Sequence, residues 1–371
     1  MALCAAVAIA ACSNATTTSN LSIGPNFGAG TLYAANSTQN GVSIYSKGEA
    51  SGKGPVNQVG GSNTGFSDPQ YLAFDGSNNL WVTNYNPSTQ VGEIIEVEAN
   101  ATGNVLPFGV INGVGDGVVR PRGIAINATD KIVLVANVNP TAGSPFESQL
   151  LIFGPTDAQA GVQVPGEIIA GPNTMMNVPS GVALSGYTGY VTNLQGASVE
   201  AFLIPTPTPA PSPTATPVPT PTPTPTPVGA TPSPSPSPSP TPTPVNIAPT
   251  LVLSGALTGL TRPSGIALDA TGNLYVSDEG SVSVPPSILV FPSGLTGTVD
   301  QAPARKITGS NTQLFAPTDV AVDASGNIYV ADTTASGAGM VYIFAASANG
   351  NVAPMTTYTS PGVPIGLGLV P

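Results

Sequence analysis

Short runs in which apolar and polar residues alternate recur along this chain, and two of them are near-copies. The first is PSGIALDATGNLYVSDEG (263–280) and the second is PTDVAVDASGNIYVAD (317–332). In each, an alternating run such as that around Ile266 and Leu268 predicts a half-buried strand. The turn DATGN or DASGN follows, and Gly272 and Gly326 are expected to take the left-handed conformation that closes a hairpin. Each copy therefore predicts a Pro-led strand, a tight turn and a second strand.

Looser copies begin at Pro69, Pro121 and Pro179. With the copies at Pro263 and Pro317 they follow one another at intervals of about fifty residues, apart from one longer interval. Later in each copy, a third strand ends in an aromatic residue, as in SILVFPSG, and a weaker fourth strand follows, as in ARKITGS. Four antiparallel strands per repeat are typical of a propeller blade. The pattern predicts an all-β propeller of four-stranded antiparallel blades.

The two ends of the chain carry complementary parts of one further repeat. TLYAANSTQNGVSIYSKG (31–48) supplies a second and a third strand but has no Pro-led first strand. PIGLGLV (364–370) is a first strand with nothing after it. We expect the C-terminal strand to complete the N-terminal blade, which gives six blades and closes the ring.

The long interval contains a Pro/Thr/Ser-rich tract, residues 205–244. Its composition favours polyproline II and cannot build a packed core. ASVEAFLI before it is expected to be a third strand, and APTLVLSGALTG after it a fourth strand. The tract is therefore predicted to be a disordered insertion within the fourth blade. A spacer between two half-rings is the alternative.

The N-terminus is expected to be a targeting segment. Residues 1–12 are apolar and too short to span a bilayer, which suits a signal peptide. Ile9–Cys12 is similar to a bacterial lipobox, in which Cys12 would carry the lipid, although no Lys or Arg precedes the apolar run. The alternative is a signal peptide with an incidental cysteine. Residues 13–22 would be a tether, and 23–371 a single propeller domain.

Composition excludes several classes of function. The chain has no histidine, so Ser-His-Asp catalysis and His-ligated zinc are ruled out. Its 8 Lys and Arg and net charge of −11 leave no basic surface for nucleic acid or for anionic membranes. The 2 cysteines, Cys4 and Cys12, cannot cross-link the body of the protein. Membrane contact is expected only through the lipid anchor.

The block P-x-G-[IV]-A-[LI]-D-x-x-G-N-[LI]-Y-V-[AS]-D resembles the NHL repeat. The match is strong at 263–278 and 317–332 and looser at the copies from Pro69, Pro121 and Pro179, and the usual Asn-x-Arg of the third strand is not kept. The resemblance implies a six-bladed β-propeller. NHL domains mostly bind partners, whereas some related propellers are enzymes, so the resemblance supports the fold more than any activity.

The second strands end in a column of amide or carboxylate residues, one for each blade. The column is Asn36, Asn84, Asn137, Asn193, Asp278 and Asp332. Such a ring could hold a hard cation or a polar ligand near the axis. The alternative, which repetition in every blade favours, is that each side chain caps its own loop.

Two positions depart from the repeat where the innermost strands border the central channel. Two residues after the leading Pro, four of the six blades have Gly, but Tyr71 and Asp319 stand there in the others. Arg122, Arg262 and Arg120 lie beside the same opening. Tyr71, Arg122, Asp319 and Arg262 are therefore candidates for binding a small anionic or sugar-like ligand. Ordinary drift with charge pairing is the alternative.

Two functions of different classes follow. The preferred one is a monomeric, lipid-anchored, extracytoplasmic module of the cell envelope that binds a protein or a glycan. It needs no cofactor and no catalytic residue. The alternative is a metal-dependent hydrolase of the lactonase type, in which Asp278, Asp332 and Asn84 could hold a divalent cation on the axis.

Overall fold

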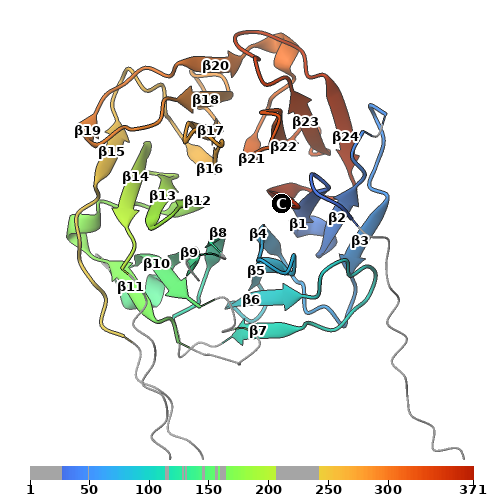
Figure 1. Ribbon diagram of the computed structural model, residues 1–371, viewed down its shortest axis with the longest axis horizontal. Helices are drawn as coiled ribbons and strands as arrows, with labels where there is room; N and C mark the ends of the chain where they lie inside the picture. The colour runs from blue at the N-terminus through green and yellow to red at the C-terminus, as the bar shows by residue number, and fades with distance from the viewer. Residues whose placement is uncertain are drawn as a thin grey trace, which may run out of the picture.

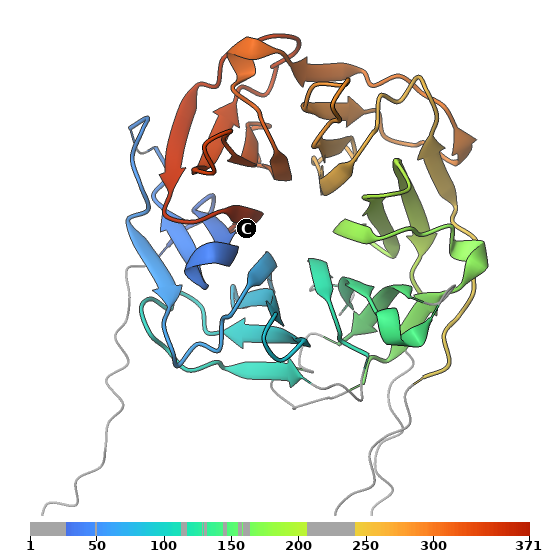
Figure 2. The ribbon, with the colours of Figure 1, turned by 180° about the vertical axis from the view of Figure 1, so that it is seen from behind.

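The computed structural model describes residues 27–371 except 49, 113–116, 128, 130–131, 144–146, 155–157, 159–163 and 206–241. The predicted signal peptide, Cys12, the tether and most of the Pro-rich tract lie outside the described residues. Six sheets stand in a ring (Figure 1), and the same ring of blades is seen from behind in Figure 2. The six-bladed, all-β fold predicted from the repeats is confirmed.

All six innermost strands begin at a proline, as the repeat predicts. They are β25 (Pro364–Leu369), β4 (Pro69–Phe74), β8 (Pro121–Asn127), β12 (Pro179–Ser185), β16 (Pro263–Leu268) and β21 (Pro317–Val322), for blades one to six. The second strands are β1 (Leu32–Asn36), β5 (Leu80–Asn86), β9 (Ile132–Val138), β13 (Thr188–Asn193), β17 (Leu274–Asp278) and β22 (Ile328–Thr333).

The third and outer strands complete each blade. The third strands are β2 (Gly41–Tyr45), β6 (Val91–Val97), β10 (Ser148–Phe153), β14 (Ser198–Leu203), β18 (Ser287–Phe291) and β23 (Gly339–Phe344). The outer strands are β3 (Asn57–Gly60), β7 (Gly109–Asn112), β11 (Glu167–Ala170), β15 (Leu251–Ser254), β20 (Arg305–Thr308) and β24 (Thr356–Ser360). Short 3-10 turns occur at Ser37–Gln39, Pro140–Ala142, Pro172–Thr174 and Ser310–Thr312.

The ring is closed by pairing between the two ends of the chain. β25 pairs antiparallel with β1, with Leu32 opposite Leu369. Blade one therefore takes its innermost strand from the C-terminal part of the sequence and its other three from the N-terminal part. The closure protects strand edges that an open array would expose.

The hydrophobic core is divided among the junctions between blades. Each apolar cluster joins side chains of two neighbouring blades, as when Val82 and Ile95 of blade two meet Ile44 of blade one. The other junctions have clusters of the same kind. Trp81 is fully buried in the junction between blades two and three. A single blade could not bury both faces of its sheet, which explains why the repeat recurs.

The repeated D-x-x-G-N-x-Y signature builds the hairpin between the first two strands. Asp269 accepts backbone N–H groups from Thr271 (2.9 Å) and Asn273 (3.0 Å). It also accepts the Asn273 side-chain amide (2.8 Å) and the Tyr275 hydroxyl (3.2 Å). Gly272 has φ of 82°, the left-handed value expected from the sequence. The signature therefore specifies a turn rather than a chemical site.

A feature that the repeat pattern did not predict covers the outer strands. The segment between the third and outer strands of a blade reaches back to the preceding blade. There β19 (Gly297–Val299) pairs in parallel with β15. Equivalent parallel bridges are Val59↔Gly103, Ile169↔Val245, Ile307↔Gly350 and Lys53↔Tyr358. These contacts shield the sheet edges that a ring still presents at its rim.

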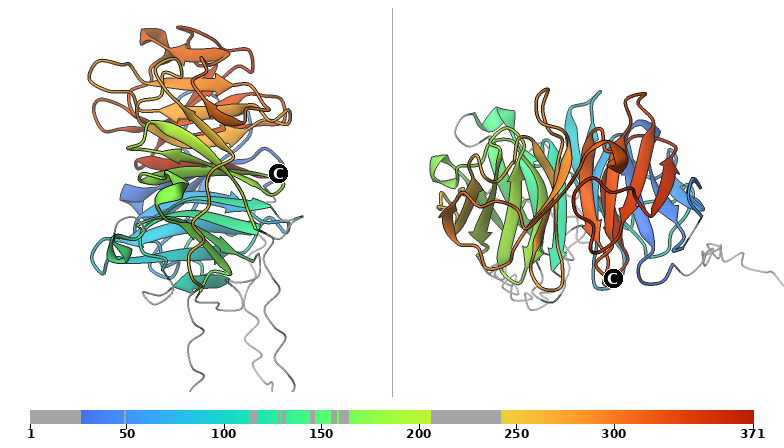
Figure 3. Two further views of the ribbon diagram at one scale, coloured as in Figure 1. Left: turned by 90° about the vertical axis from the view of Figure 1, so that its left-hand side faces the viewer. Right: turned by 90° about the horizontal axis from the view of Figure 1, so that it is seen from above.

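The fourth blade is continuous in space across the long insertion. β14 and β15 are antiparallel neighbours, with Ala201 opposite Leu251. The stretch between them therefore connects adjacent strands of one sheet. In the edge-on views of Figure 3 the blades form a thick disc. No helix in the described part of the chain is long and apolar enough to cross a bilayer.

Candidate functional site

The column at the ends of the second strands lies on the top face, defined as the face where the six innermost strands begin. Asn84 accepts the N–H groups of Ser67 (2.9 Å) and Asp68 (3.2 Å), in the loop that leads to its own innermost strand. Asp278 accepts those of Thr261 (2.7 Å) and Arg262 (3.1 Å). These hydrogen bonds are the ones that a loop cap makes.

The other members of the column bond in related ways. Asn137, Asn193 and Asp332 also accept backbone N–H groups of the preceding loop, whereas Asn36 accepts the Ser360 hydroxyl at 2.5 Å. All six side chains are buried. Among the described residues, no group of three or more acidic or cysteine side chains could hold a metal ion.

The glycines of the innermost strands mark very close contacts between neighbouring blades. A Cβ on Gly366 would lie 2.5 Å from the Cα of Tyr71, and one on Gly265 would lie 2.5 Å from the Cα of Asp319. The strands approach so closely that one partner at each contact must lack a side chain. Tyr71 and Asp319 therefore fit because the preceding blade supplies a glycine opposite each of them.

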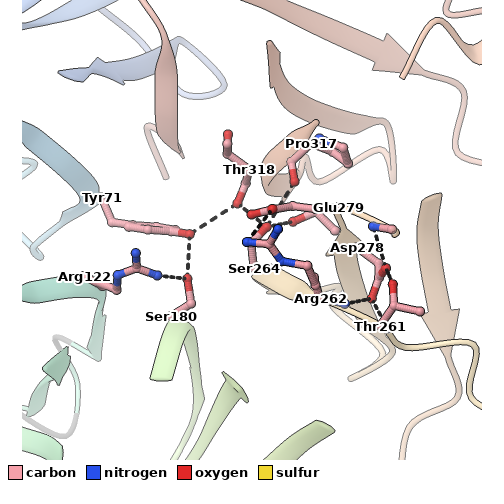
Figure 4. A network of polar contacts seen from close by, with 12 residues as sticks. Tyr71, Arg122, Ser180, Thr261, Arg262, Ser264, Asp278, Glu279, Pro317 and Thr318 are labelled. Atoms are coloured by element: carbon pink, nitrogen blue, oxygen red, sulfur yellow. Dashed lines mark hydrogen bonds and ion pairs between the residues drawn. The ribbon is translucent and has the colours of Figure 1, made fainter. Parts of the chain in front are cut away.

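Tyr71 lies across the central channel. Its hydroxyl donates to the Thr318 carbonyl of blade six (3.2 Å) and lies 3.3 Å from Ser180 Oγ of blade four. Figure 4 shows the ring reaching from its own blade to these two partners. The side chain is only 6% exposed. Tyr71 therefore divides the channel into a half that faces the top and a half that faces the bottom.

The upper half of the channel is polar. Besides Tyr71, it contains Arg122 and Arg262, which are two more of the four predicted ligand residues. Arg122 donates to Ser180 Oγ at 3.3 Å, so Arg122 and Tyr71 share one partner. Arg262 forms an ion pair with Glu279 at 3.2 Å, and the two side chains are 55% and 24% exposed. Burial raises the pKa of Glu279, although Arg262 and Arg122 both act to lower it.

Asp319, the fourth predicted residue, lies in the lower half of the channel. It is 5% exposed, and its Oδ2 accepts the Leu367 N–H at 2.8 Å. Burial raises its pKa from 3.8 to about 8, against the opposing effect of N–H groups from Leu367 and Val320. Asp319 therefore lines the lower half of the channel, whereas Arg122 bonds to Ser180 and Arg262 pairs with Glu279 in the upper half.

The sequence pattern did not point to two members of the upper half. Glu279 and Ser180 were not singled out, although Glu279 directly follows Asp278 of the column and so had to lie at the opening. Arg120 was expected beside the channel. Its guanidinium lies over the Tyr85 ring, 5.8 Å from the centroid.

A groove of about 400 Å³ lies on the top face between the loops of blades five and six. Pro285, Pro286, Leu314 and Phe315 are among the residues that line it. The Phe315 side chain is 54% exposed. The same face presents Val282, which is fully exposed at the tip of a turn closed by mutual backbone hydrogen bonds of Ser281 and Val284. No pattern along the chain indicates this groove, because it arises between two blades.

No family model matches the chain, and no curated protein does. Among solved structures, one from a nidogen/laminin complex is similar at 13% identity with a TM-score of 0.52, covering 93% of this chain and 99% of that one. A Bacteroides fragilis protein provisionally assigned as a 6-phosphogluconolactonase is similar at 15% identity with a TM-score of 0.49, covering 89% and 80%. At these identities the fold alone is shared. The chain is a six-bladed β-propeller, and its membership of the NHL family stays a prediction.

Proposed function

We propose that this propeller is a binding module that captures an extended segment of another protein on its top face. The observation that carries the proposal is the groove between blades five and six, with Phe315 exposed in its lining and Val282 exposed on the same face, in the loop that leads to Pro285 and Pro286. Protein interfaces gain most of their energy where an apolar side chain enters such a pocket. An apolar groove on an exposed face is the kind of surface at which proteins bind one another.

One wall of the groove is held by local structure, which favours binding. Pro285 and Pro286 have no backbone freedom in φ to lose, and the turn beside them is fixed by the hydrogen bond from Ser281 N–H to the Val284 carbonyl (2.7 Å). Glu279 belongs to the same loop, so its ion pair with Arg262 can orient a polar group of the partner. We expect the partner to insert an aliphatic or aromatic side chain into the groove and to present a charged group towards this pair.

Two further points support a binding role. The similar structure from the nidogen/laminin complex comes from an assembly of two proteins. The sequence also favours export and lipid attachment at Cys12, which would hold a monomeric propeller at the cell envelope. A glycan partner stays a second prediction, and a glycan array probed with the protein and with Phe315→Asp would test it.

The hydrolase alternative depends on a divalent cation on the axis. The oxygens of Asn84, Asp278 and Asp332 already accept loop N–H groups. A stoichiometric metal whose removal by chelator lowers the melting temperature would favour the hydrolase over the binding module.

Site-specific photo-crosslinking in cells that produce the full chain tests the binding proposal. A crosslinking side chain at position 282 should give a discrete crosslinked protein, and this product should disappear when Phe315→Asp is added. The matched control is position 106, where Leu106 is 75% exposed in a loop on the bottom face. Absence of a product at 282, or a product that Phe315→Asp leaves unchanged, would overturn the proposal.

A further inference from the structure

Three hydrogen bonds in series connect four blades across the central channel. Arg122 of blade three donates to Ser180 Oγ of blade four (3.3 Å), and Ser180 Oγ lies 3.3 Å from the Tyr71 hydroxyl of blade two. The Tyr71 hydroxyl has one proton, which it donates to the Thr318 carbonyl of blade six (3.2 Å). Ser180 therefore donates to Tyr71, and every bond of the series runs from Arg122 towards Thr318 (Figure 4).

This series uses little of the hydrogen-bonding capacity of Arg122. A guanidinium has five N–H donors, and within the described part of the chain Arg122 donates one hydrogen bond, to Ser180. The only ion pair among the described residues joins Arg262 to Glu279, so no carboxylate contacts Arg122. Burial raises the pKa of Asp68 and of Glu279, whereas the charge of Arg122 lowers both. Two carboxylates thus lie near Arg122 without pairing with it.

The remaining donors of Arg122 can be reached from the top face. Ser180 and Tyr71 are buried, whereas Arg122 is half-buried, so its guanidinium lies between the packed series and the opening. Below Tyr71 lies a separate cavity of about 230 Å³ that Asp319 lines. A planar guanidinium matches the two oxygens of a carboxylate, with which it forms two parallel charge-assisted hydrogen bonds. Partial burial strengthens such bonds, because less water competes for them.

We propose that the upper half of the channel binds a small hydroxycarboxylate, whose carboxylate accepts two hydrogen bonds from Arg122. The hydroxyl groups of Ser180 and Tyr71 next to the guanidinium suit a ligand with a polar body. The proposal goes beyond the capture of a protein segment, because the groove that Phe315 lines contributes no residue to this site. It also gives a reason for one departure from the repeat: Tyr71 replaces a glycine and carries the hydrogen bonds that hold Arg122 in place.

Calorimetric titration of the full chain with three probes of similar shape tests the proposal. The probes are lactate, lactamide and isopropanolamine in its ammonium form. We expect lactate to bind about tenfold more tightly than lactamide, which lacks the charge, and we expect the ammonium not to bind. Arg122→Gln should remove the preference for lactate. Arg122→Lys keeps the charge but not the planar group, so it should retain only part of the preference.

A matched control makes the same change in net charge elsewhere. Lys53→Gln alters an exposed side chain where blade one reaches back to blade six, and it should leave all three affinities unchanged. Thermal unfolding shows whether both Arg122 variants are folded. Equal affinity for lactate and lactamide in the original protein would overturn the proposal, as would a preference that survives Arg122→Gln. Absence of binding by every probe would also overturn it and would leave Arg122 to balance the charges of Asp68 and Glu279.

Discussion

Individual side chains in the innermost strands depend on what the neighbouring blade offers them. Tyr71 can cross the channel because Gly366 stands opposite its Cα, and Asp319 fits because Gly265 stands opposite. Each pairing joins residues that are far apart in sequence. Whether a position can depart from the repeat therefore also depends on the residue opposite it in the neighbouring blade.

Gly366→Ala is expected to destabilise the fold by roughly 1–3 kcal/mol. Its new methyl group would lie 2.5 Å from the Cα of Tyr71 and 2.6 Å from the carbonyl oxygen of Gln70, where backbone cannot give way easily. Chemical denaturation measures the effect. Gly28→Ala is the matched control, because nothing lies within 4 Å of its Cβ, and it should be near neutral. Equal stability of the two variants would contradict the close contact.

The pKa of Asp319 predicts how stability varies with pH. Because burial raises its pKa from 3.8 to about 8, the folded state favours the protonated carboxyl. The contribution of Asp319 to the stability of the folded state is full below about pH 4 and is lost as the pH rises through about 8. The free energy of unfolding should therefore fall between pH 5 and 8.

Asp319→Asn should flatten this pH dependence and should raise stability most at pH 8, since the amide keeps an acceptor for the Leu367 N–H. Denaturation curves at several pH values measure this dependence of the free energy of unfolding on pH. Burial also raises the pKa of Glu200 to about 8 and that of Asp332 to about 6, so part of the slope should remain. An unchanged slope in Asp319→Asn would show that Asp319 is not the group responsible.

At the scale of elements, the strongest sequence signal turned out to specify hairpins. Asp323 repeats the hydrogen bonds of Asp269, with Ser325 N–H at 2.9 Å and Asn327 N–H at 2.8 Å. Local signals of this kind are readable from sequence because donor and acceptor lie within a few residues. The column of Asn and Asp was readable for a different reason, because it recurs once in every blade. Its bonds are those of loop caps, and in five of the six blades they span 16 to 18 residues.

Asp323→Ala should destabilise the protein by about 2 kcal/mol, the scale of lost hydrogen bonds to a charged group. Hydrogen exchange should increase first in the β21–β22 hairpin. Ser325→Ala is the control, because only its backbone N–H contacts Asp323. A uniform increase in exchange over all six blades would argue against a local role for the cap.

At the scale of the molecule, stability depends on closure. β25 contributes Leu367 to the apolar cluster between blades six and one, and it covers the edge of β1. Closure of the ring does not depend on the Pro-rich tract, because the tract joins two strands that already pair.

Deletion of residues 363–371 should therefore abolish cooperative unfolding and promote aggregation through the exposed edge of β1. Deletion of residues 210–237 should leave the melting temperature within a few degrees, since long surface loops contribute little to closure entropy. Calorimetry measures the unfolding of both deletion variants, and light scattering measures their aggregation. A cooperative transition that survives the first deletion would show that the ring does not need its closing strand.

The sequence by itself determined the number of blades, the Pro-led innermost strands, the hairpin turns and the closing strand, because these depend on periodicity and on contacts within one repeat. Tertiary structure decided the rest. Four features lie between blades: the Tyr71 side chain across the channel, the cavity around Asp319, the ion pair of Arg262 with Glu279, and the groove beside Phe315. Their geometry depends on how closely neighbouring sheets approach, and no period along a single chain records that distance.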